Sequence, residues 1–211
     1  MSVISKLAAS LNRRDEVPNQ ELAREIVEND DTHAVQELIS NLNNKSKEIQ
    51  NDCIKVLYEI GELNPTLISS NYQEFLDLLH SKNNRLQWGA MMGLSCITIE
   101  KPKAIYSSLP QILKAADQGS VITKDHAINI LIKLCTLQPY AESAFSLLCE
   151  QLLKSLPNQL PMYAERAMPI VNDKNRKEFI KALNSRLDDI DKESKRKRVE
   201  KVIKKMRVLE K

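Results

Sequence analysis

Apolar residues recur along the chain with a period of 37 residues, and three prolines, Pro65, Pro102 and Pro139, keep the register. Each copy has a small residue, a larger aliphatic residue four positions later and another after three more. Because these positions share one face of an α-helix, the pattern predicts one amphipathic helix in every copy. The four copies read Cys53, Leu57, Ile60; Ala90, Leu94, Ile97; Ala127, Leu131, Leu134; and Ala164, Met168, Val171.

A second helix is predicted between these. Its apolar face reads Val35, Leu38, Ile39, Leu42; then Tyr72, Phe75, Leu76, Leu79; then Leu109, Ile112, Leu113, Ala116; and, more weakly, Leu147, Leu148, Leu152, Leu153. One antiparallel pair cannot bury its apolar stripes, whereas a stack of pairs can. The sequence therefore predicts an all-α fold, a right-handed α-α superhelix (solenoid) of about five two-helix repeats.

The predicted organisation is a single α-solenoid domain over residues 1–211. Capping helices occupy residues 1–30, repeats residues 31–175, and a C-terminal capping repeat residues 176–211. The N-terminal helices are read from Leu7, Leu11, Leu22, Ile26 and Val27. The last two helices are read from Phe179, Ile180, Leu183, Leu187 and from Val199, Val202, Ile203, Met206, Leu209. The last helix carries a basic outer face, and a polar outer face is what a terminal repeat needs to remain soluble.

The repeated helix resembles the second helix of the HEAT-repeat family over about residues 30–190. That family reads hydrophobic–Arg–x–x–Ala–x–x–x–Leu, and this chain is similar at 49–57, 86–94, 123–131 and, in degenerate form, 160–168. Gln50, Gln87, Lys124 and Pro161 stand at the arginine position. The resemblance implies a curved helical scaffold whose second helices line a concave face and bind other macromolecules.

Composition supports this interpretation. The 211 residues include only four glycines and 4% aromatic residues, which disfavours β-sandwiches and barrels. The glycines form no phosphate-binding loop. The formal net charge of +3 conceals an asymmetry, because residues 1–172 carry a net −4 and residues 173–211 a net +7. An acidic body is therefore expected to end in a basic helix.

The four cysteines are widely spaced and form no CxxC pair. They are predicted to be reduced core residues, which fits a cytoplasmic protein. The first residues lack the apolar run of a signal peptide, and the most apolar stretch, 88–99, is too short to span a membrane. No membrane association is expected.

No catalytic, cofactor-binding or metal-binding residues are predicted. The three histidines are far apart, and neither a metal-ligand motif nor a catalytic constellation is visible. A solvated or hydrogen-bonded role is the simplest interpretation of His126. We therefore expect a protein that is not an enzyme.

The candidate partner-binding residues are those expected to face the groove: Trp88, Met92, His126, Asn129, Tyr163 and Arg166. Tryptophan, tyrosine and arginine dominate the energetics of many interfaces. Trp88 is the only tryptophan, and Gly89 and Gly93 beside it lie within a predicted helix, where close packing could offset their low helix propensity. The simpler alternative is that Trp88 packs between repeats.

Three functions fit these features. The leading hypothesis is a non-enzymatic scaffold that binds a protein partner through its concave face. The alternative is a nucleic-acid-binding helical-repeat protein that uses the basic C-terminal helix, although that helix offers no aromatic residue for base stacking. A regulatory subunit of a larger enzyme is a third possibility, which the sequence does not separate from the first.

Overall fold

The computed structural model describes residues 2–208, and these residues form α-helices, short 3-10 helices and loops, with no strand among them. The α-helices are α1 (Val17–Glu28), α2 (Thr32–Ser40), α3 (Lys47–Leu63), α4 (Thr66–Ser69), α5 (Tyr72–Leu78), α6 (Asn84–Cys96), α7 (Pro102–Ser107), α8 (Leu109–Gln118), α9 (Val121–Cys135), α10 (Ala141–Lys154), α11 (Leu160–Ala167), α12 (Arg176–Asn184) and α13 (Glu193–Val208). The 3-10 helices are η1 (Val3–Lys6), η2 (Asn41–Asn43), η3 (Met168–Ile170) and η4 (Leu187–Asp189). The predicted all-α repeat fold is confirmed.

The chain divides into two compact units, Met1–Ala127 and Ile128–Lys211, here called unit 1 and unit 2. The division falls inside α9. The boundaries predicted at residues 30 and 175 stay a prediction. Each unit is described by itself.

In unit 1, α3 is the central helix and packs against α1 on one side and α6 on the other. Its predicted apolar stripe, Cys53, Leu57 and Ile60, is completely buried. The equivalent stripe of α6, Ala90, Leu94 and Ile97, is also completely buried. Helices α2 and α5 pack against α3 and α6 respectively, so each repeat contributes helices to two layers. The periodic pattern therefore identified the core of these repeats correctly.

Two glycines allow neighbouring side chains to approach α6 closely. A Cβ atom at Gly89 would lie 2.6 Å from Cγ1 of Ile54 on α3, which is closer than carbon atoms can pack. A Cβ atom at Gly93 would lie 3.1–3.2 Å from the ring of Phe75 on α5. The close packing that the sequence suggested for these glycines is thus present at both positions.

Two repeats contain an additional short helix before the predicted one. Helix α4 precedes α5, and α7 precedes α8, so these repeats have three helices rather than two. At the second break Pro110 lies in the first turn of α8. A proline has no N–H group to continue the preceding helix, so α7 ends and α8 begins with a new direction. Helical repeats of this type occur with two or three helices.

Amide side chains connect adjacent repeats in unit 1. Gln50 and Gln87, which replace the arginine of the HEAT pattern, donate to the backbone carbonyls of Asn44 (2.7 Å) and Leu79 (2.9 Å). Asn83 at the start of α6 donates to Gln50 (3.2 Å) and to Asn51 (3.0 Å) of α3. The two Asn83 bonds therefore link adjacent repeats without an acid–arginine pair, whereas the Gln50 and Gln87 bonds to backbone carbonyls stay within one repeat.

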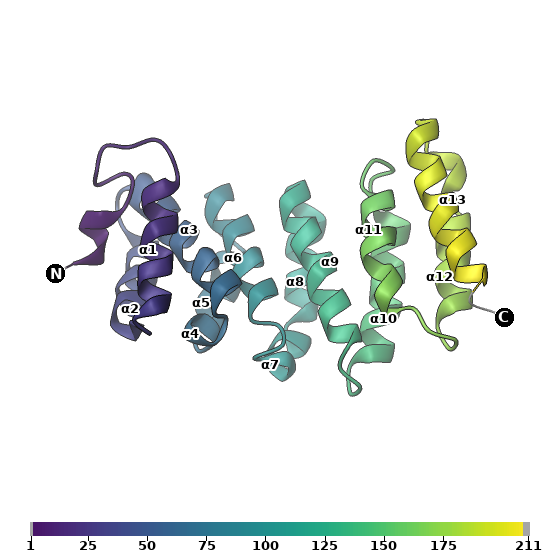
Figure 1. Cartoon of the computed structure of the whole chain (residues 1–211), viewed down its shortest axis with the longest axis horizontal. Helices are drawn as coiled ribbons and strands as arrows, with labels where there is room; N and C mark the ends of the chain where they lie inside the picture. Colours follow the sequence, from purple (N-terminus) through teal and green to yellow (C-terminus); the bar gives the residue numbers. More distant parts are fainter. Residues whose placement is uncertain (1, 209–211) are drawn as a thin grey trace. The chain divides into compact units, whose positions relative to one another are not determined.

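In unit 2, α11 packs beside α13, and α10 packs beside α12. Figure 1 shows α11 and α13 in front of α10 and α12. The Phe145 and Phe179 rings, from α10 and α12, lie 6.4 Å apart in the core of this unit. Val199, Val202, Ile203 and Met206 form the buried face of α13, as predicted, and Leu209 lies outside the described residues.

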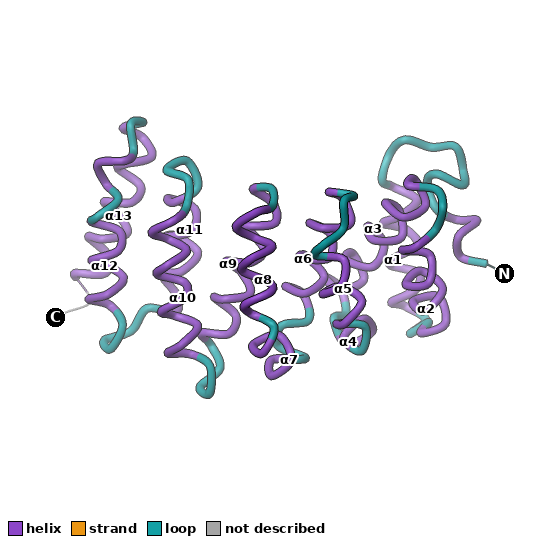
Figure 2. The backbone as a smooth tube through the Cα atoms, turned by 180° about the vertical axis from the view of Figure 1, so that it is seen from behind, coloured by secondary structure: helices purple, strands orange, loops and turns teal. Residues whose placement is uncertain are grey.

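The N-terminal segment differs from the predicted capping helix. A 3-10 helix, Val3–Lys6, is followed by turns, and Figure 2 shows the wide loop that leads from it into α1. Leu7 is completely buried but Leu11 is 49% exposed. The two leucines therefore do not share a helical face. Pro18 lies in the first turn of α1, where a proline is tolerated.

Candidate functional site

Trp88 belongs to a row of four side chains on α3 and α6, in which two aromatic rings lie between two cations. Its half-buried ring lies 5.6 Å from the ring of Tyr58, at an interplanar angle of 44°. The guanidinium of Arg85 lies over the Trp88 ring at 5.9 Å, and the ammonium of Lys55 lies over the Tyr58 ring at 4.9 Å. We call Lys55, Tyr58, Trp88 and Arg85 the cation–aromatic row. Such contacts are attractive because cations favour the negative face of an aromatic ring.

Glu16, the residue before α1, links the two ends of this row. One carboxylate oxygen lies 2.9 Å from Nζ of Lys55, and the other lies 2.6 Å from Nη2 of Arg85. The hydrogen bond from Lys55 holds the pKa of Glu16 below its ordinary value, against the opposing effect of burial and with the help of both positive charges. Glu16 is therefore a carboxylate at neutral pH and fixes both cations.

Lys55 and Tyr58 are the buried members of the row, and only 7% of the Lys55 side chain is exposed. Burial alone would lower its pKa, but hydrogen bonds to Glu59, Glu16 and Tyr58 raise it above the ordinary value. Glu59 lies one turn further along α3, with Oε1 2.5 Å from the ammonium nitrogen. Burial also raises the pKa of Tyr58, although Lys55 opposes this change. The row is thus charged at Lys55 and neutral at Tyr58 at physiological pH.

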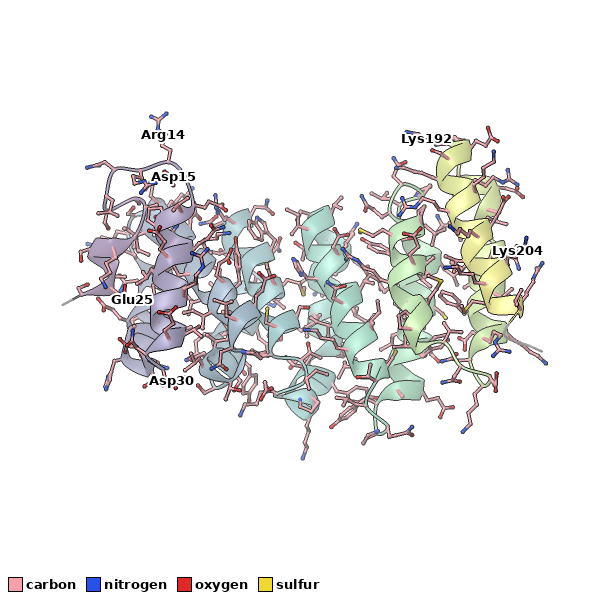
Figure 3. The ribbon with its side chains drawn as sticks, in the orientation of Figure 1. Arg14, Asp15, Glu25, Asp30, Lys192 and Lys204 are labelled. Carbon is pink, nitrogen blue, oxygen red and sulfur yellow. The ribbon has the colours of Figure 1, made fainter. Side chains whose placement is uncertain are left out.

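An open cavity of about 760 Å³ lies beside Arg85, between the loop before α1 and the start of α3. The loop contributes Arg13, Arg14 and Asp15 to its lining, and α3 contributes Asn51 and Asp52. Asp52 accepts hydrogen bonds from the backbone N–H of Ala9 (2.7 Å) and from Asn19 (2.8 Å), which ties the N-terminal segment to α3. Figure 3 shows Arg14 pointing outward at the outer edge of the loop. This part of the surface is polar and carries charges of both signs.

The six candidate residues fall into two groups. Trp88 and Met92 lie one turn apart on α6 in unit 1, and both are half-buried. His126 is half-buried on α9, in the part of that helix that belongs to unit 1. In unit 2, Arg166 of α11 is exposed and donates a long hydrogen bond (3.4 Å) to the side chain of Asn129 on α9.

Tyr163 is the candidate with the least accessible side chain, since only 2% of the residue is exposed. Tyr163 occupies the same position in its repeat as Gly89 does in an earlier one, and the Gly89 backbone lies directly against Ile54 of the repeat before it. Tyr163 therefore contributes to the core of unit 2 and offers almost no surface to a partner.

Sequence reasoning did not select Glu16, Tyr58 and Arg85. Glu16 belongs to no repeat, and Tyr58 stands 30 positions before Trp88 rather than a full period. Arg85 offers a weak signal, because it lies three residues before Trp88 and therefore on the same helical face. The approach of Tyr58 depends on how α3 packs against α6, and the repeat pattern does not encode that.

Nothing in residues 2–208 groups three or more metal-ligating side chains. All four cysteines are reduced, and Cys53 and Cys149 are buried whereas Cys96 and Cys135 are half-buried. Burial raises the pKa of Cys53, Cys135 and Cys149 to about 12. These three thiols are therefore protonated and unreactive at neutral pH.

Stacked helical units define an α-helical repeat protein, and solved structures agree with that class. One is an engineered protein (TM-score 0.63, 18% identity, 99% of this chain and 98% of that chain). Another is a designed armadillo repeat protein in complex with the peptide (KR)4 (TM-score 0.64, 15% identity, 89% of this chain and 86% of that chain). A further designed armadillo repeat protein is similar (TM-score 0.60, 14% identity, 96% of this chain and 99% of that chain). The chain therefore has an armadillo/HEAT-like helical repeat fold.

No family model matches the chain, and no curated protein matches it. None of the helices within residues 2–208 has both the length and the apolar character needed to cross a membrane.

Proposed function

We propose that this protein is a non-enzymatic scaffold that binds a partner protein through the face formed by the second helices of its repeats, which the HEAT resemblance implies to be concave. The cation–aromatic row carries the proposal. It presents a half-buried tryptophan between an arginine and a tyrosine, the residue types that contribute most to binding energy at interfaces.

The row is well suited to binding because its side chains are already held in place. Glu16 fixes Lys55 and Arg85, and the two cations lie over the rings of Tyr58 and Trp88. A partner would lose little further side-chain entropy from these residues on binding. The accessible part of the Trp88 indole would cover an apolar side chain of the partner, with charged groups around it.

Two further observations support a binding role. The designed armadillo repeat protein of similar fold was solved in complex with the peptide (KR)4, which supports a peptide-binding role for such a fold. The four free thiols suit a reducing compartment, so a cytoplasmic location is part of this proposal.

The experiment compares affinity capture from native lysate by the wild-type chain and by Trp88→Ala, Trp88→Phe and Leu63→Ala. Leu63 is 53% exposed and serves as a matched loss of apolar surface elsewhere in unit 1. We expect one stoichiometric protein with the wild type and with Leu63→Ala, reduced capture with Trp88→Phe, and none with Trp88→Ala. Circular dichroism verifies that each variant is folded. A folded Trp88→Ala chain that captures the same protein at the same level contradicts the proposal.

A further inference from the structure

The last helix of unit 2 carries a cluster of cations with too few local counter-charges. Lys197, Lys201, Lys204 and Lys205 are exposed on α13, and we call these four residues the lysine face. Lys197 pairs with Glu193 at 2.6 Å. Lys201, Lys204 and Lys205 form no ion pair with any carboxylate among the described residues.

The carboxylates near α13 are already occupied by other side chains. Glu200 and Asp188 both pair with Arg196, at 3.4 and 3.0 Å. Glu165 of α11 accepts two hydrogen bonds from Arg198, at 2.9 and 2.6 Å. The charges of Lys201 and Lys205 also help to hold the pKa of Glu165 below its ordinary value, after the larger effect of the Arg198 hydrogen bond. The lysine face is therefore a source of positive potential that nearby acids do not cancel.

The spacing of the four lysines makes them repel one another in the free protein. Lys197, Lys201 and Lys205 follow one another at four-residue intervals, and Lys204 lies three residues after Lys201. Like charges at these spacings are neighbours on a helix and repel each other. A terminal repeat needs only a polar outer face, which glutamates and lysines in alternation would supply without this repulsion. The repulsion disappears when an anionic group binds.

The face is rigid and projects into solvent. The opposite side of α13, formed by Val199, Val202, Ile203 and Met206, is buried against unit 2, so the helix cannot turn an apolar side toward a membrane. Figure 3 shows Lys204 on the side of α13 that faces away from α11. The cations from Lys197 to Lys205 extend over about 12 Å, given the rise of an α-helix. An extended peptide covers this length with about four residues.

We propose that the lysine face binds a short acidic segment of a partner protein. Charge complementarity is the main argument, since Lys201, Lys204 and Lys205 form no ion pair among the described residues. The span of about 12 Å fits a few consecutive aspartates or glutamates. The arginines Arg196 and Arg198, which could bind phosphate in bidentate fashion, are instead held by carboxylates. The described outer faces of α12 and α13 also offer no exposed aromatic side chain for base stacking.

This inference rests on the proposed scaffold function but uses a different unit, so the two can fail separately. The test measures fluorescence anisotropy of a labelled hexaglutamate peptide with the full chain, at roughly 50 and 300 mM NaCl. We expect saturable binding at low salt that weakens at high salt, and no binding of a hexaglutamine peptide. Trp88→Ala should bind hexaglutamate as the wild type does, which separates this surface from the cation–aromatic row.

The decisive variant is Lys201→Gln/Lys204→Gln/Lys205→Gln. Its matched control, Lys82→Gln/Lys103→Gln/Lys114→Gln, removes three exposed lysines from unit 1 and changes the net charge equally. We expect the first variant to lose about tenfold or more in affinity and the control to retain it. Equal losses in both variants would show a net-charge effect and overturn the proposal.

Competing occupants give distinct results in the same assay. Tighter binding of a single-stranded oligothymidylate than of hexaglutamate would assign the face to nucleic acid. Sedimentation with phosphatidylserine vesicles but not with phosphatidylcholine vesicles, in the absence of peptide binding, would assign it to a membrane surface. Salt-sensitive self-association in light scattering, lost in the Lys201→Gln/Lys204→Gln/Lys205→Gln chain, would assign it to a second copy. Each of these results overturns the proposal.

Discussion

Glu16 and Arg85 are 69 residues apart in the sequence, and a hydrogen bond of 2.6 Å joins them in the structure. The same carboxylate pairs with Lys55 at 2.9 Å, so one side chain before α1 connects to both α3 and α6. This arrangement fixes the N-terminal loop and the cation–aromatic row at once. A residue outside the repeats therefore organises the candidate binding surface.

Replacement of Glu16 by Gln should destabilise unit 1 modestly. The side chain is 48% exposed, and Lys55 retains Glu59, so we expect a loss of roughly 0.5–1 kcal/mol in the free energy of unfolding at neutral pH. Urea denaturation followed by the fluorescence of Trp88 measures this loss. Glu21→Gln is the control, because Glu21 is an exposed acid of α1 without a carboxylate-specific contact. An equal effect of both substitutions would contradict the assigned role.

The contribution of Glu16 should also depend on pH. Its pKa in the folded protein lies below the ordinary value of 4.5, because Lys55 donates a hydrogen bond to the carboxylate. A carboxyl group whose pKa is lowered on folding stabilises the protein above its unfolded pKa and loses this effect as the pH falls through the folded pKa. The stability difference between wild type and Glu16→Gln should therefore be full at pH 7 and shrink below about pH 4.5. Urea titrations across that range measure it.

Replacement of Gly89 by Ala should destabilise the protein even though alanine is the better helix former. The new Cβ would meet Cγ1 of Ile54 at 2.6 Å in a packed interface. Overpacking of this kind costs about 1–3 kcal/mol, which exceeds the gain in helix propensity of about 0.5–1 kcal/mol. A double-mutant cycle with Ile54→Ala tests the cause, since Gly89→Ala should cost less when the clashing atom is absent. The same cost in both backgrounds would exclude this contact as the reason.

The repeat pattern predicted the fold because each stacked helix is buried along a single stripe of apolar residues. Cys53, Leu57 and Ile60 illustrate this, since a spacing of four and three residues is sufficient to place all three in the core. The pattern did not predict the additional helix α7. It reports only the periodicity of apolar residues, whereas the break before α8 depends on Pro110.

The sequence contains only part of the information that defines the candidate site. Trp88 could be named from the sequence, but its contact with Tyr58 depends on the packing of α3 against α6. Tyr163 illustrates the limit of the register. It aligns with the half-buried polar residues Asp52 and His126, yet its own side chain is almost completely buried, and the repeat pattern does not encode this difference.

Replacement of Arg186 by Ala should destabilise unit 2 by about 1–3 kcal/mol. Its guanidinium donates to the backbone carbonyls of Leu152 (2.9 Å), Leu153 and Ser155 (3.0 Å) at the end of α10, where helix carbonyls lack i+4 donors. The Leu152 carbonyl also accepts from the Ser155 hydroxyl. Without it, three carbonyls lose a charged donor, and two of these bonds are partly buried. Hydrogen exchange should show reduced protection in the last turn of α10, with thermal unfolding by circular dichroism as the second measurement.

Two control variants show whether the effect of Arg186→Ala comes from its hydrogen bonds or from its charge. Arg186→Lys retains the charge but cannot reach all three carbonyls in the same geometry, so it should restore only part of the stability. Lys154→Ala removes an exposed cation from the same turn and should change little. Full restoration by lysine would mean that charge alone, and not the fork of hydrogen bonds, stabilises the end of α10.

The buried thiols should resist alkylation until the protein unfolds. Burial raises the pKa of Cys53, Cys135 and Cys149 to about 12, so only a minute fraction of each is the reactive thiolate near neutral pH. A short pulse of N-ethylmaleimide at neutral pH should leave these three residues unmodified in peptide mass spectrometry, and the same pulse in guanidinium chloride should modify all four cysteines. Modification of Cys53 or Cys149 in the native protein at the rate seen in denaturant would show that these helices open far more often than their complete packing implies.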